Sequence, residues 1–349
     1  MASDTVIFLS NWFLNNPYKR FLVQQLQVQG IEIELKRCSV LFLPKVLKSG
    51  IPKALHFHML HSFLLARTPV TQFLKFLFFI AQLLVLKLLG VRLIWTVHEW
   101  TDKLRDDRQN VPSPYAAVIG RCLNAIICHC VSTQREIEQV MRLPPNGKAQ
   151  VIPHGHYIDA YDNQISSVQA REKLGIPPES TVFLLFGSIY RYKGVVEAID
   201  AFKSLFSTDH EAILLIAGSL KEADLKEEID RKMQGCQNIR FIDQRIPEEE
   251  VQVYMNASDC VVTPYQTFTT SGVAVLVMSF ARACIAPRIG FFEDILDDTG
   301  AIFYDSDSPA GLRKAMKSAI DAKEQLLEMG KHNLAIAQQW DWKTIAEKT

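Results

Sequence analysis

The sequence predicts an α/β protein made of two doubly wound parallel sheets, each covered by helices. Short runs of β-branched and aromatic residues alternate with helical patterns in both halves of the chain, an order that is typical of parallel sheets. The pattern stops once, in a stretch rich in proline, glycine and polar residues, and then starts again. The 349 residues are enough for two domains with separate cores.

Five apolar runs are the expected strands of the first unit. They lie at residues 6–9, 31–35, 54–58, 93–97 and 125–128. The first run is preceded by neither the basic residues nor the long apolar core of a signal peptide, so we interpret it as a strand. The first unit is expected to cover residues 1–165.

A second set of runs predicts a second unit of the same kind. These runs lie at residues 182–186, 212–217, 239–242, 260–264 and 283–286. We place the seam between 152–156 and 175–180, the second unit at 166–330, and a C-terminal helical segment at 331–349. Ligands of such Rossmann-like units bind at the carboxyl ends of the strands. We therefore expect the site in a central cleft that the two domains face.

The composition is that of an ordinary globular protein. The formal net charge is +0 and 48% of the residues are hydrophobic, which excludes a disordered chain. The 7 cysteines form no CxxC pair and their number is odd, which argues against a disulfide framework. We therefore expect a cytoplasmic protein, and we expect no nucleic-acid partner.

The charge is uneven within the first half of the chain. Residues 35–98 contain nine lysines and arginines but no aspartate or glutamate, and within them residues 76–86 are apolar except for Gln82. One interpretation is a helix that lies on the inner face of a membrane, with Lys75 and Lys87 attracting anionic lipid. The other is a core helix whose lysines extend to the surface. Both interpretations stay open at this point.

Two segments of the second half have the composition of anion-binding sites. In the first, an apolar strand runs into Gly187 and then into a turn that carries Arg191 and Lys193. In the second, Ser271 and Gly272 stand at the expected start of a helix, where unpaired N–H groups attract phosphate. Together the two segments indicate a bound sugar nucleotide.

Five motifs occur in a specific order and spacing, at residues 95–99, 151–157, 186–194, 259–265 and 270–273. With them the chain resembles the GT-B glycosyltransferases, most closely the family 4-like bacterial enzymes that extend cell-surface and exopolysaccharide glycans. The resemblance implies transfer of a hexose-type unit from a nucleotide diphosphate sugar to a glycan or lipid-linked acceptor, in polysaccharide or glycolipid synthesis. Residues 340–346 resemble the tail that crosses back to the first domain in this fold.

The resemblance assigns the donor diphosphate to the second unit. Its cations and helix start would stabilise the charge that grows on the leaving group. The residues that match are Gly187, Ser188, Arg191, Lys193, Thr270, Ser271, Gly272 and Val273. Ser188 stands where the family often has arginine, so the resemblance puts more weight on Arg191 and Lys193.

A second departure concerns the donor ribose. Many relatives carry two glutamates around this helix, and alignment of the flanking residues puts Phe268 and Leu276 at their positions. We therefore expect Glu293 or Asp294 to hold the ribose. His154, at the expected seam, is assigned to sugar or phosphate contact.

His98 matches the family's histidine and is the expected catalytic residue. It follows an apolar strand, at the edge of a parallel sheet where ligands bind. An imidazole with an ordinary pKa near ~6.5 suits a general base in an inverting reaction. In a retaining reaction the same side chain would hydrogen-bond the donor sugar. Glu99 and Asp102 are alternative bases in the same loop.

Three other segments contain residue types that bind metals. They are His56, His58 and His61, the segment 128–130 with its two cysteines and His129, and the Asp305-Ser306-Asp307 string. We interpret the histidines as acceptor contacts or structural residues, the second segment as a strand end, and the last as the cap of a helix. No metal and no cofactor beyond the donor substrate is expected.

Two other functions fit the same donor residues. A GT-B sugar-nucleotide epimerase would act on a single soluble substrate, without the basic segment or a membrane. A noncatalytic nucleotide- or sugar-binding subunit is suggested by the absence of the two glutamates.

Overall fold

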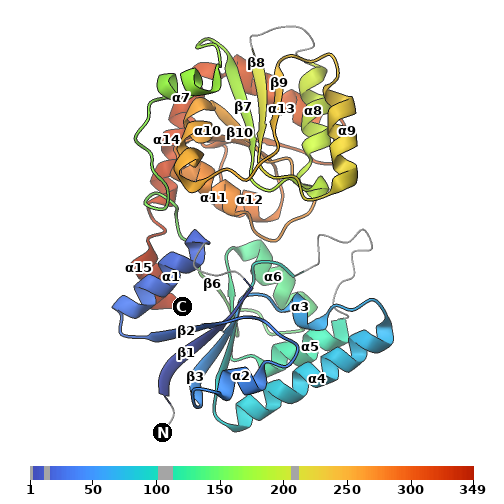
Figure 1. The fold of residues 1–349 in the computed structure, drawn as a ribbon, viewed down its shortest axis with the longest axis vertical. Coiled ribbons are helices and arrows are strands. Elements are labelled where there is room, and N and C mark those ends of the chain that lie inside the picture. Colours follow the sequence, from blue (N-terminus) through green and yellow to red (C-terminus); the bar gives the residue numbers. More distant parts are fainter. Residues whose placement is uncertain (1–2, 12–15, 101–112, 206–211) are drawn as a thin grey trace. The chain divides into compact units, whose positions relative to one another are not determined.

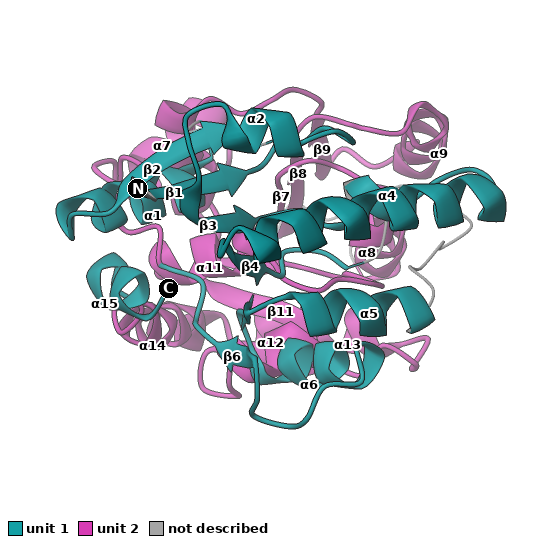
Figure 2. Cartoon of the chain, turned by 90° about the horizontal axis from the view of Figure 1, so that it is seen from below, with its two compact units in different colours: residues 1–155, 341–349 teal, residues 156–340 magenta. Residues whose placement is uncertain are grey.

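The computed structural model describes residues 3–11, 16–100, 113–205 and 212–349. The chain forms two compact units, shown in two colours in Figure 2. Unit 1 comprises Met1–Gly155 and Asp341–Thr349, and unit 2 comprises His156–Trp340. The expected boundary at 165/166 is therefore corrected to 155/156, and only the last nine residues of the expected tail belong to unit 1, since the chain up to Trp340 packs within unit 2.

Unit 1 contains one parallel sheet in the order β2-β1-β3-β4-β5-β6. The strands are β1 (Ser3–Leu9), β2 (Glu32–Lys36), β3 (Pro52–Phe57), β4 (Arg92–Thr96), β5 (Ala125–Cys128) and β6 (Ala149–Val151). The five predicted strands are present, and β6 is an additional short strand at the edge beside β5. The order of the strands reverses at β1, which places β3 to β6 side by side in chain order.

Helices cover both faces of this sheet (Figure 1). They are α1 (Pro17–Val28), α2 (Leu43–Leu47), α3 (His61–Leu64), α4 (Pro69–Leu88), α5 (Ser113–Cys122), α6 (Val131–Val140) and α15 (Trp342–Lys348). The C-terminal α15 packs on α1, with the rings of Phe21 and Trp342 stacked at a centroid distance of 5.7 Å. Trp342 also covers Gly155, where an added Cβ would lie 2.4 Å from the indole. A glycine is therefore required at this position.

Unit 2 repeats the architecture with the sheet order β12-β11-β10-β7-β8-β9. Its strands are β7 (Thr181–Phe186), β8 (Ala212–Ala217), β9 (Ile239–Ile242), β10 (Cys260–Val262), β11 (Ala283–Pro287) and β12 (Ala301–Tyr304). All residues of β7, β8, β10 and β11 are buried, as expected for parallel strands that are covered on both faces. The five predicted strands are again present, and β12 is an additional edge strand.

The helices of unit 2 lie on both sides of the sheet, with α8, α9 and α13 together on one side in Figure 1. The helices are α7 (Ser167–Leu174), α8 (Val195–Lys203), α9 (Ala223–Met233), α10 (Val251–Ala257), α11 (Gly272–Ser279), α12 (Gly290–Ile295), α13 (Gly311–Asp321) and α14 (Leu326–Ala337). Short 3-10 turns lie at η1 (Arg191–Lys193), η2 (Glu248–Glu250) and η3 (Lys323–Gln325). The strand order reverses at β7, so the loops after β7 and β10 flank the position where such sheets bind ligands.

Candidate active site

Four neighbouring strands of unit 1 are each followed by a histidine. His58 follows β3, His98 follows β4, His129 follows β5, and His154 follows β6. Because parallel strands end at the same edge of their sheet, these four side chains are brought together although 96 positions separate the first from the last. His56, inside β3, stacks on His58 with ring centroids 4.5 Å apart.

The rings contact one another directly. His58 Nδ1 lies 3.2 Å from His98 Nε2, which is hydrogen-bonding distance. The ring centroids of His98 and His129 are 5.2 Å apart, as are those of His129 and His154. The ring of Tyr18, from α1, packs against three of these imidazoles at 4.7 to 5.4 Å. We call the five histidines together with Tyr18 the imidazole cluster.

The imidazole cluster is buried and uncharged near neutral pH. Burial lowers the pKa of His129 to about 4 and the pKa of His154 to about 3. Burial, and then the neighbouring His129 and His154, hold the pKa of His98 well below its usual range. The expectation of an ordinary pKa for His98 is therefore wrong, because the side chain has lost its contact with water. Its neutral form is still the form that a general base requires.

The structure groups the remaining predicted residues of unit 1 differently from the sequence. His154, which the sequence assigns to sugar or phosphate contact, lies in the imidazole cluster of unit 1. Glu99 follows His98 and is half-buried. Asp102 lies outside the described residues, and so do the side-chain contacts of His61. The sequence assigns His129 no role in the site, because the strand order that brings its ring beside those of His98 and His154 cannot be read from the sequence.

In unit 2 the two segments with an anion-binding composition lie side by side. Gly187, directly after β7, has a φ of +95°, in the region that favours glycine. A Cβ built on it would lie 3.3 Å from Val273 Cγ2 and 3.4 Å from Lys193 Nζ. Gly187, Lys193 and the first turn of α11 therefore surround the same point.

Three contacts join the loop after β7 to the loop after β10. The backbone N–H of Gln266 donates to the carbonyl of Tyr192 at 2.8 Å. Gly194, with a φ of +69°, approaches Pro264 so closely that an added Cβ would lie 2.0 Å from its carbonyl oxygen. The Lys193 ammonium lies 5.4 Å from the centroid of the Tyr265 ring, a cation–π distance. Lys193 is only 7% exposed, so its charge is fixed in this position.

The first turn of α11 presents backbone N–H groups beside Lys193. Ser271 is the N-cap, and its hydroxyl accepts from the N–H of Ala274 at 3.2 Å. An added Cβ at Gly272 would meet only Tyr157 within 4 Å, at 3.4 Å from the hydroxyl, an ordinary contact. The fold of unit 2 therefore does not require glycine at this position. Thr270, just before the cap, is half-buried, as is Ser188 after Gly187.

Arg191 does not join this group in the way that the sequence predicts. Its guanidinium lies 3.0 Å from Asp224 and 2.5 Å from Glu228, and its backbone N–H donates to Glu222. These hydrogen bonds and ion pairs raise the pKa of Arg191, chiefly through Glu228. The carboxylates of α9 and its N-cap thus pair with the charge that the sequence assigns to the diphosphate, and the assignment of Arg191 stays a prediction.

The expected ribose ligands lie on α12. Glu293 and Asp294 are exposed, in the first turn and a half of this short helix. The residue before them, Phe292, packs on Phe268 with ring centroids 4.5 Å apart and on Tyr265 at 5.6 Å. Aromatic packing thus involves Phe268, at a position where the resemblance implies a glutamate, and it holds α12 beside the loop that leads to α11.

The described residues hold no group of three or more histidine, cysteine, aspartate or glutamate side chains that could bind a metal ion. The Asp305-Ser306-Asp307 string forms a turn in which Asp305 accepts from the N–H of Asp307 at 2.9 Å. The following helix begins only at Gly311, with Ala310 as N-cap. The string is therefore not the helix cap that the sequence predicts.

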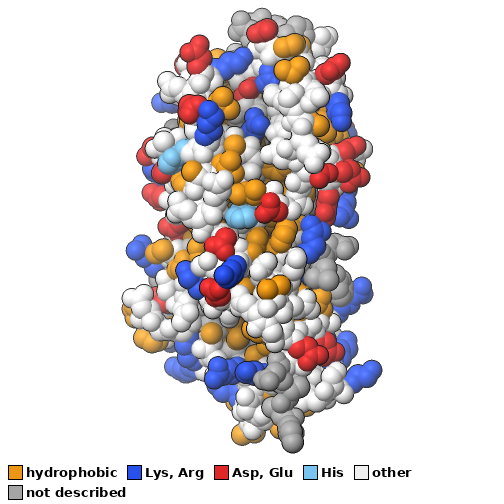
Figure 3. All heavy atoms as spheres, turned by 90° about the vertical axis from the view of Figure 1, so that its left-hand side faces the viewer, with side chains coloured by type: hydrophobic (Ala, Val, Ile, Leu, Met, Phe, Trp, Pro, Cys, Tyr) orange, Lys and Arg blue, Asp and Glu red, His pale blue; other side chains and the backbone are white. Residues whose placement is uncertain are grey.

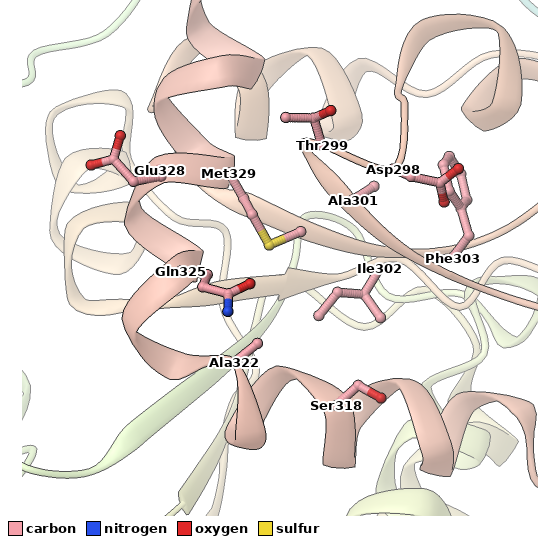
Figure 4. A pocket seen from close by; sticks show the side chains of 10 residues that line it. All are labelled: Asp298, Thr299, Ala301, Ile302, Phe303, Ser318, Ala322, Gln325, Glu328 and Met329. Carbon is pink, nitrogen blue, oxygen red and sulfur yellow. The ribbon is translucent and has the colours of Figure 1, made fainter.

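A cavity of about 600 Å³ lies on unit 2 between β12, α13 and α14 (Figure 4). Its lining includes the side chains of Ile302, Gln325 and Met329. None of the predicted site residues lines it. It therefore has no part in the donor site described above.

Comparison with known proteins finds a family match over part of the chain. Residues 167–334 match the family of glycosyl transferases group 1. The D-inositol 3-phosphate glycosyltransferase of Corynebacterium glutamicum (strain R) is 24% identical over 272 residues, which are 73% of this chain and 65% of that protein. The enzyme of the same name from Corynebacterium diphtheriae (strain ATCC 700971 / NCTC 13129 / Biotype gravis) is 25% identical over 62% of this chain and 53% of its own length. The chain thus spans less than two thirds of the length of these relatives.

Solved structures agree over nearly the whole chain. The sucrose-phosphate synthase from Thermosynechococcus elongatus superposes with a TM-score of 0.77 at 14% identity, over 99% of this chain and 96% of that chain. Anabaena Alr3699/HepE in complex with UDP-glucose gives a TM-score of 0.74 at 14% identity, over 99% and 97%. The fold is the two-unit α/β fold that the sequence predicts. The chain therefore has the fold of these structures, and its residues 167–334 match the family of glycosyl transferases group 1.

Proposed function

We propose that the protein transfers a sugar from a nucleotide diphosphate sugar to a glycan or lipid-linked acceptor, in polysaccharide or glycolipid synthesis. The observation that carries the proposal is the meeting of Lys193, Gly187 and the N-terminus of α11 in unit 2. A nearly buried ammonium and a helix N-terminus side by side favour a ligand with more than one negative charge. A diphosphate fits this requirement.

The donor residues would act on the leaving group. As the bond between the sugar carbon and the diphosphate oxygen breaks, its electron pair stays on the diphosphate, whose charge grows. Lys193 and the N–H groups of the first turn of α11 are fixed donors at that position, so they stabilise the charge without reorganisation. Gly272 lets the ligand approach the backbone, since the fold itself does not require glycine at this position. This role needs no metal ion.

His98 would act on the acceptor. The acceptor oxygen forms a bond to the sugar carbon and loses its proton, which the neutral imidazole accepts. Because burial holds the pKa of His98 low, it takes the proton only when the acceptor hydroxyl has become acidic in the transition state. If the reaction retains configuration, His98 would instead hydrogen-bond the donor sugar.

A screen of nucleotide sugars tests the proposal. The Anabaena protein was solved in complex with UDP-glucose, so UDP and its sugars are the first probes, followed by the GDP and ADP series. A ligand at 100 times its Kd raises the free energy of unfolding by about 2.7 kcal/mol, which is visible as a higher Tm. A transferase turns over the stabilising donor only with an acceptor. Conversion of the sugar without an acceptor indicates an epimerase, and binding without any turnover indicates a noncatalytic subunit.

We further propose that unit 1 lies on the surface of an anionic membrane through α4. Side chains along the outer side of α4 repeat every three or four positions, are apolar and are exposed to solvent: Val70, Phe73, Leu74, Leu77, Phe78, Ala81, Leu84, Val85 and Leu88. We call this set the α4 stripe. Its exposed fractions reach 69% at Val70 and 87% at Leu88. An apolar stripe of this length is typical of interfacial helices.

The other side of α4 is part of the core of unit 1. Phe76, Phe79, Leu83 and Leu86 are buried there. Among the described residues α4 is the one helix with the length and composition of a transmembrane span. The inner side of α4 packs in the hydrophobic core of unit 1, so the helix would not cross a membrane. Association with the membrane surface would leave this inner side in the core and bury the exposed apolar side in lipid. The sequence offered a core helix and a membrane-surface helix as alternatives. Both descriptions apply to α4 in part, because one side of the helix is buried and the other side is apolar and exposed.

The charge of the surrounding segment supports an anionic partner. Basic and acidic side chains are interspersed over the face shown in Figure 3, whereas residues 35–98 contain no acidic residue. Exposed cations of this segment include Arg37, Lys45, Lys48, Lys53 and Arg67. Each would contribute about 1 kcal/mol near an anionic surface. The amines of Lys75 and Lys87 donate to the carbonyls of Leu65 and Cys122, so the membrane proposal does not depend on these two lysines.

Cosedimentation with lipid vesicles tests the membrane proposal. Wild-type protein is expected to bind vesicles that contain phosphatidylglycerol, and to bind phosphatidylcholine vesicles or high-salt samples much less. The triple variant Leu74→Ser, Leu77→Ser, Phe78→Ser should lose about 10-fold or more in binding. Leu327→Ser in unit 2, where leucine is 57% exposed, is the matched control and should bind normally. Equal binding by the triple variant would contradict the proposal.

A further inference from the structure

The contact between His58 and His98 points to a more specific role for His58 than the acceptor contact or structural use that the sequence predicts. His98 is the proposed general base, and its Nε2 lies 3.2 Å from His58 Nδ1. The inference that follows rests on the proposed function, because it concerns how His98 is held for that reaction.

The other imidazoles of the cluster have partners of a different kind. His129 Nδ1 lies 3.0 Å from the carbonyl oxygen of Ile152, and His154 Nδ1 lies 2.9 Å from that of Gly155. His56 Nε2 lies 2.7 Å from the hydroxyl of Thr96. A carbonyl can only accept, so His129 and His154 carry their protons on Nδ1. His98, in contrast, faces a ring nitrogen that can either donate or accept.

The shared proton between His58 and His98 decides what His98 can do. If His58 Nδ1 donates, a neutral His98 carries its own proton on Nδ1 and cannot accept one there. If His98 Nε2 donates, a neutral His98 carries its lone pair on Nδ1, and the ring can accept a proton at that atom. The resulting imidazolium keeps its Nε2–H bonded to His58. General base catalysis therefore requires His58 to accept through Nδ1 and to hold its own proton on Nε2.

The surroundings of His58 are compatible with this role. Its Nε2, like that of His129, is buried and has no hydrogen-bond partner among the described residues. A buried polar atom without a partner costs about 1 to 3 kcal/mol, and such an atom in a native structure calls for an explanation. The ring itself is held by packing, on His56 at 4.5 Å and on Phe8 at 4.8 Å.

We propose that His58 is a positioning residue for His98. His58 Nδ1 accepts the hydrogen bond from the Nε2–H of His98, and this leaves the lone pair on Nδ1 of His98 available as the base. Other titratable groups face the pair: His56 on β3, His129 and His154 after β5 and β6, and Tyr18 and Lys19 on α1. These groups disfavour a second charge close to His98, whereas His58 remains neutral and accepts.

Nitrogen NMR of the full-length protein labelled with ¹⁵N-histidine tests the assignment without any substrate. In the wild type, His98 is expected to show a protonated Nε2 and an unprotonated Nδ1. In His58→Phe, which keeps a ring but has no nitrogen, His98 should lose this single tautomer. His58→Asn, whose amide oxygen can replace Nδ1 as acceptor, should retain it. His332→Gln, a change of a histidine of unit 2 that is paired with Asp297, is the control and should leave the His98 signals in place.

Turnover provides the second measurement. With UDP-glucose as the probe, His58→Phe should lower kcat by about 10- to 100-fold without changing the stabilisation by UDP, and His58→Asn should recover most of the rate. A wild-type His98 protonated on Nδ1, or an unchanged tautomer in His58→Phe, would overturn the proposal. Absence of turnover by the wild type with every nucleotide sugar would overturn the proposed function instead, while the NMR result would still decide the role of His58.

Discussion

The two units have the same type of sheet, but the carboxyl edges of the two sheets carry opposite chemistry. In unit 1, four neighbouring strands end in His58, His98, His129 and His154. In unit 2, β7 and β8 end in Gly187 and Gly218, and the loop after β10 leads to the N-terminus of α11. The first edge presents neutral rings that can exchange protons. The second presents N–H groups and an ammonium that can bind an anion.

This difference shows that the fold determines where a site forms, whereas the residues that follow the strands determine its chemistry. Parallel sheets gather the residues that follow their strands at one edge, whatever these residues are. The imidazoles at the edge of the sheet in unit 1 stay neutral, because burial lowers their pKa values. Glycines at the same place in unit 2 leave backbone groups accessible to a ligand. A change at one of the two edges should therefore leave the chemistry of the other intact.

The largest expected effect is acid sensitivity of unit 1. Unfolded histidines bind protons below about pH 6.5, whereas the folded pKa values of His56, His129 and His154 are about 3, 4 and 3. The unfolded state therefore binds more protons, and the free energy of unfolding falls as the pH falls through the range from 6.5 to 4. Each such histidine lowers it by about 1.4 kcal/mol per pH unit.

Tryptophan fluorescence during an acid titration measures this effect, since Trp95, Trp100 and Trp342 lie in unit 1. His332→Gln is the control, because His332 of unit 2 is paired with Asp297 on the surface. The control should leave the acid midpoint unchanged. A protein whose unit 1 is equally stable at pH 7 and pH 4.5 would contradict the account of the imidazole cluster.

A smaller but still substantial loss is expected from Gly194→Ala in unit 2. The added Cβ would lie 2.0 Å from the carbonyl oxygen of Pro264, and the φ of +69° disfavours any side chain. The loops must separate, so we expect a loss of about 2 to 4 kcal/mol in stability and weaker nucleotide binding. Chemical denaturation provides the measurement. Gly175→Ala is the matched control, since its φ is +59° and nothing lies within 4 Å of the added atom.

The smallest effect is expected from Arg191→Met. The guanidinium is half-exposed and paired with Asp224 and Glu228, and exposed ion pairs contribute about 0 to 1 kcal/mol. Stability should change little, and the affinity for UDP should stay within about threefold of the wild type. A loss of UDP binding as large as that caused by removal of Lys193 would return Arg191 to the role that its sequence position predicts.

The fold was largely predictable because its central strands are continuous apolar runs. β7 and β8 are buried along their whole length and could be identified from residue type alone. The two strands that were missed, β6 and β12, lie at the edges of the sheets. Edge strands are short and partly exposed, so their sequences do not differ clearly from those of loops.

The candidate site could be predicted only where the residues that form it are close together in the sequence. Gly187 and Lys193 belong to one turn, and Ser271 and Gly272 to one helix start. The ion pairs of Arg191 could not be predicted, because its carboxylate partners lie 31 to 37 positions away. The imidazole cluster could not be assembled from the sequence for the same reason, since only the order of β3, β4, β5 and β6 brings its histidines together.

The central claim is that the edge of unit 2 binds a diphosphate through Lys193 and α11, and calorimetric titration tests it most directly. Wild-type protein, Lys193→Met and the surface control Lys317→Met are each titrated with the nucleotide diphosphate that the screen identifies, and with the corresponding nucleoside. The account predicts tight binding of the diphosphate to the wild type and to Lys317→Met, and a loss of about 10-fold or more in Lys193→Met. Binding of the diphosphate by Lys193→Met as tight as by the wild type would contradict it.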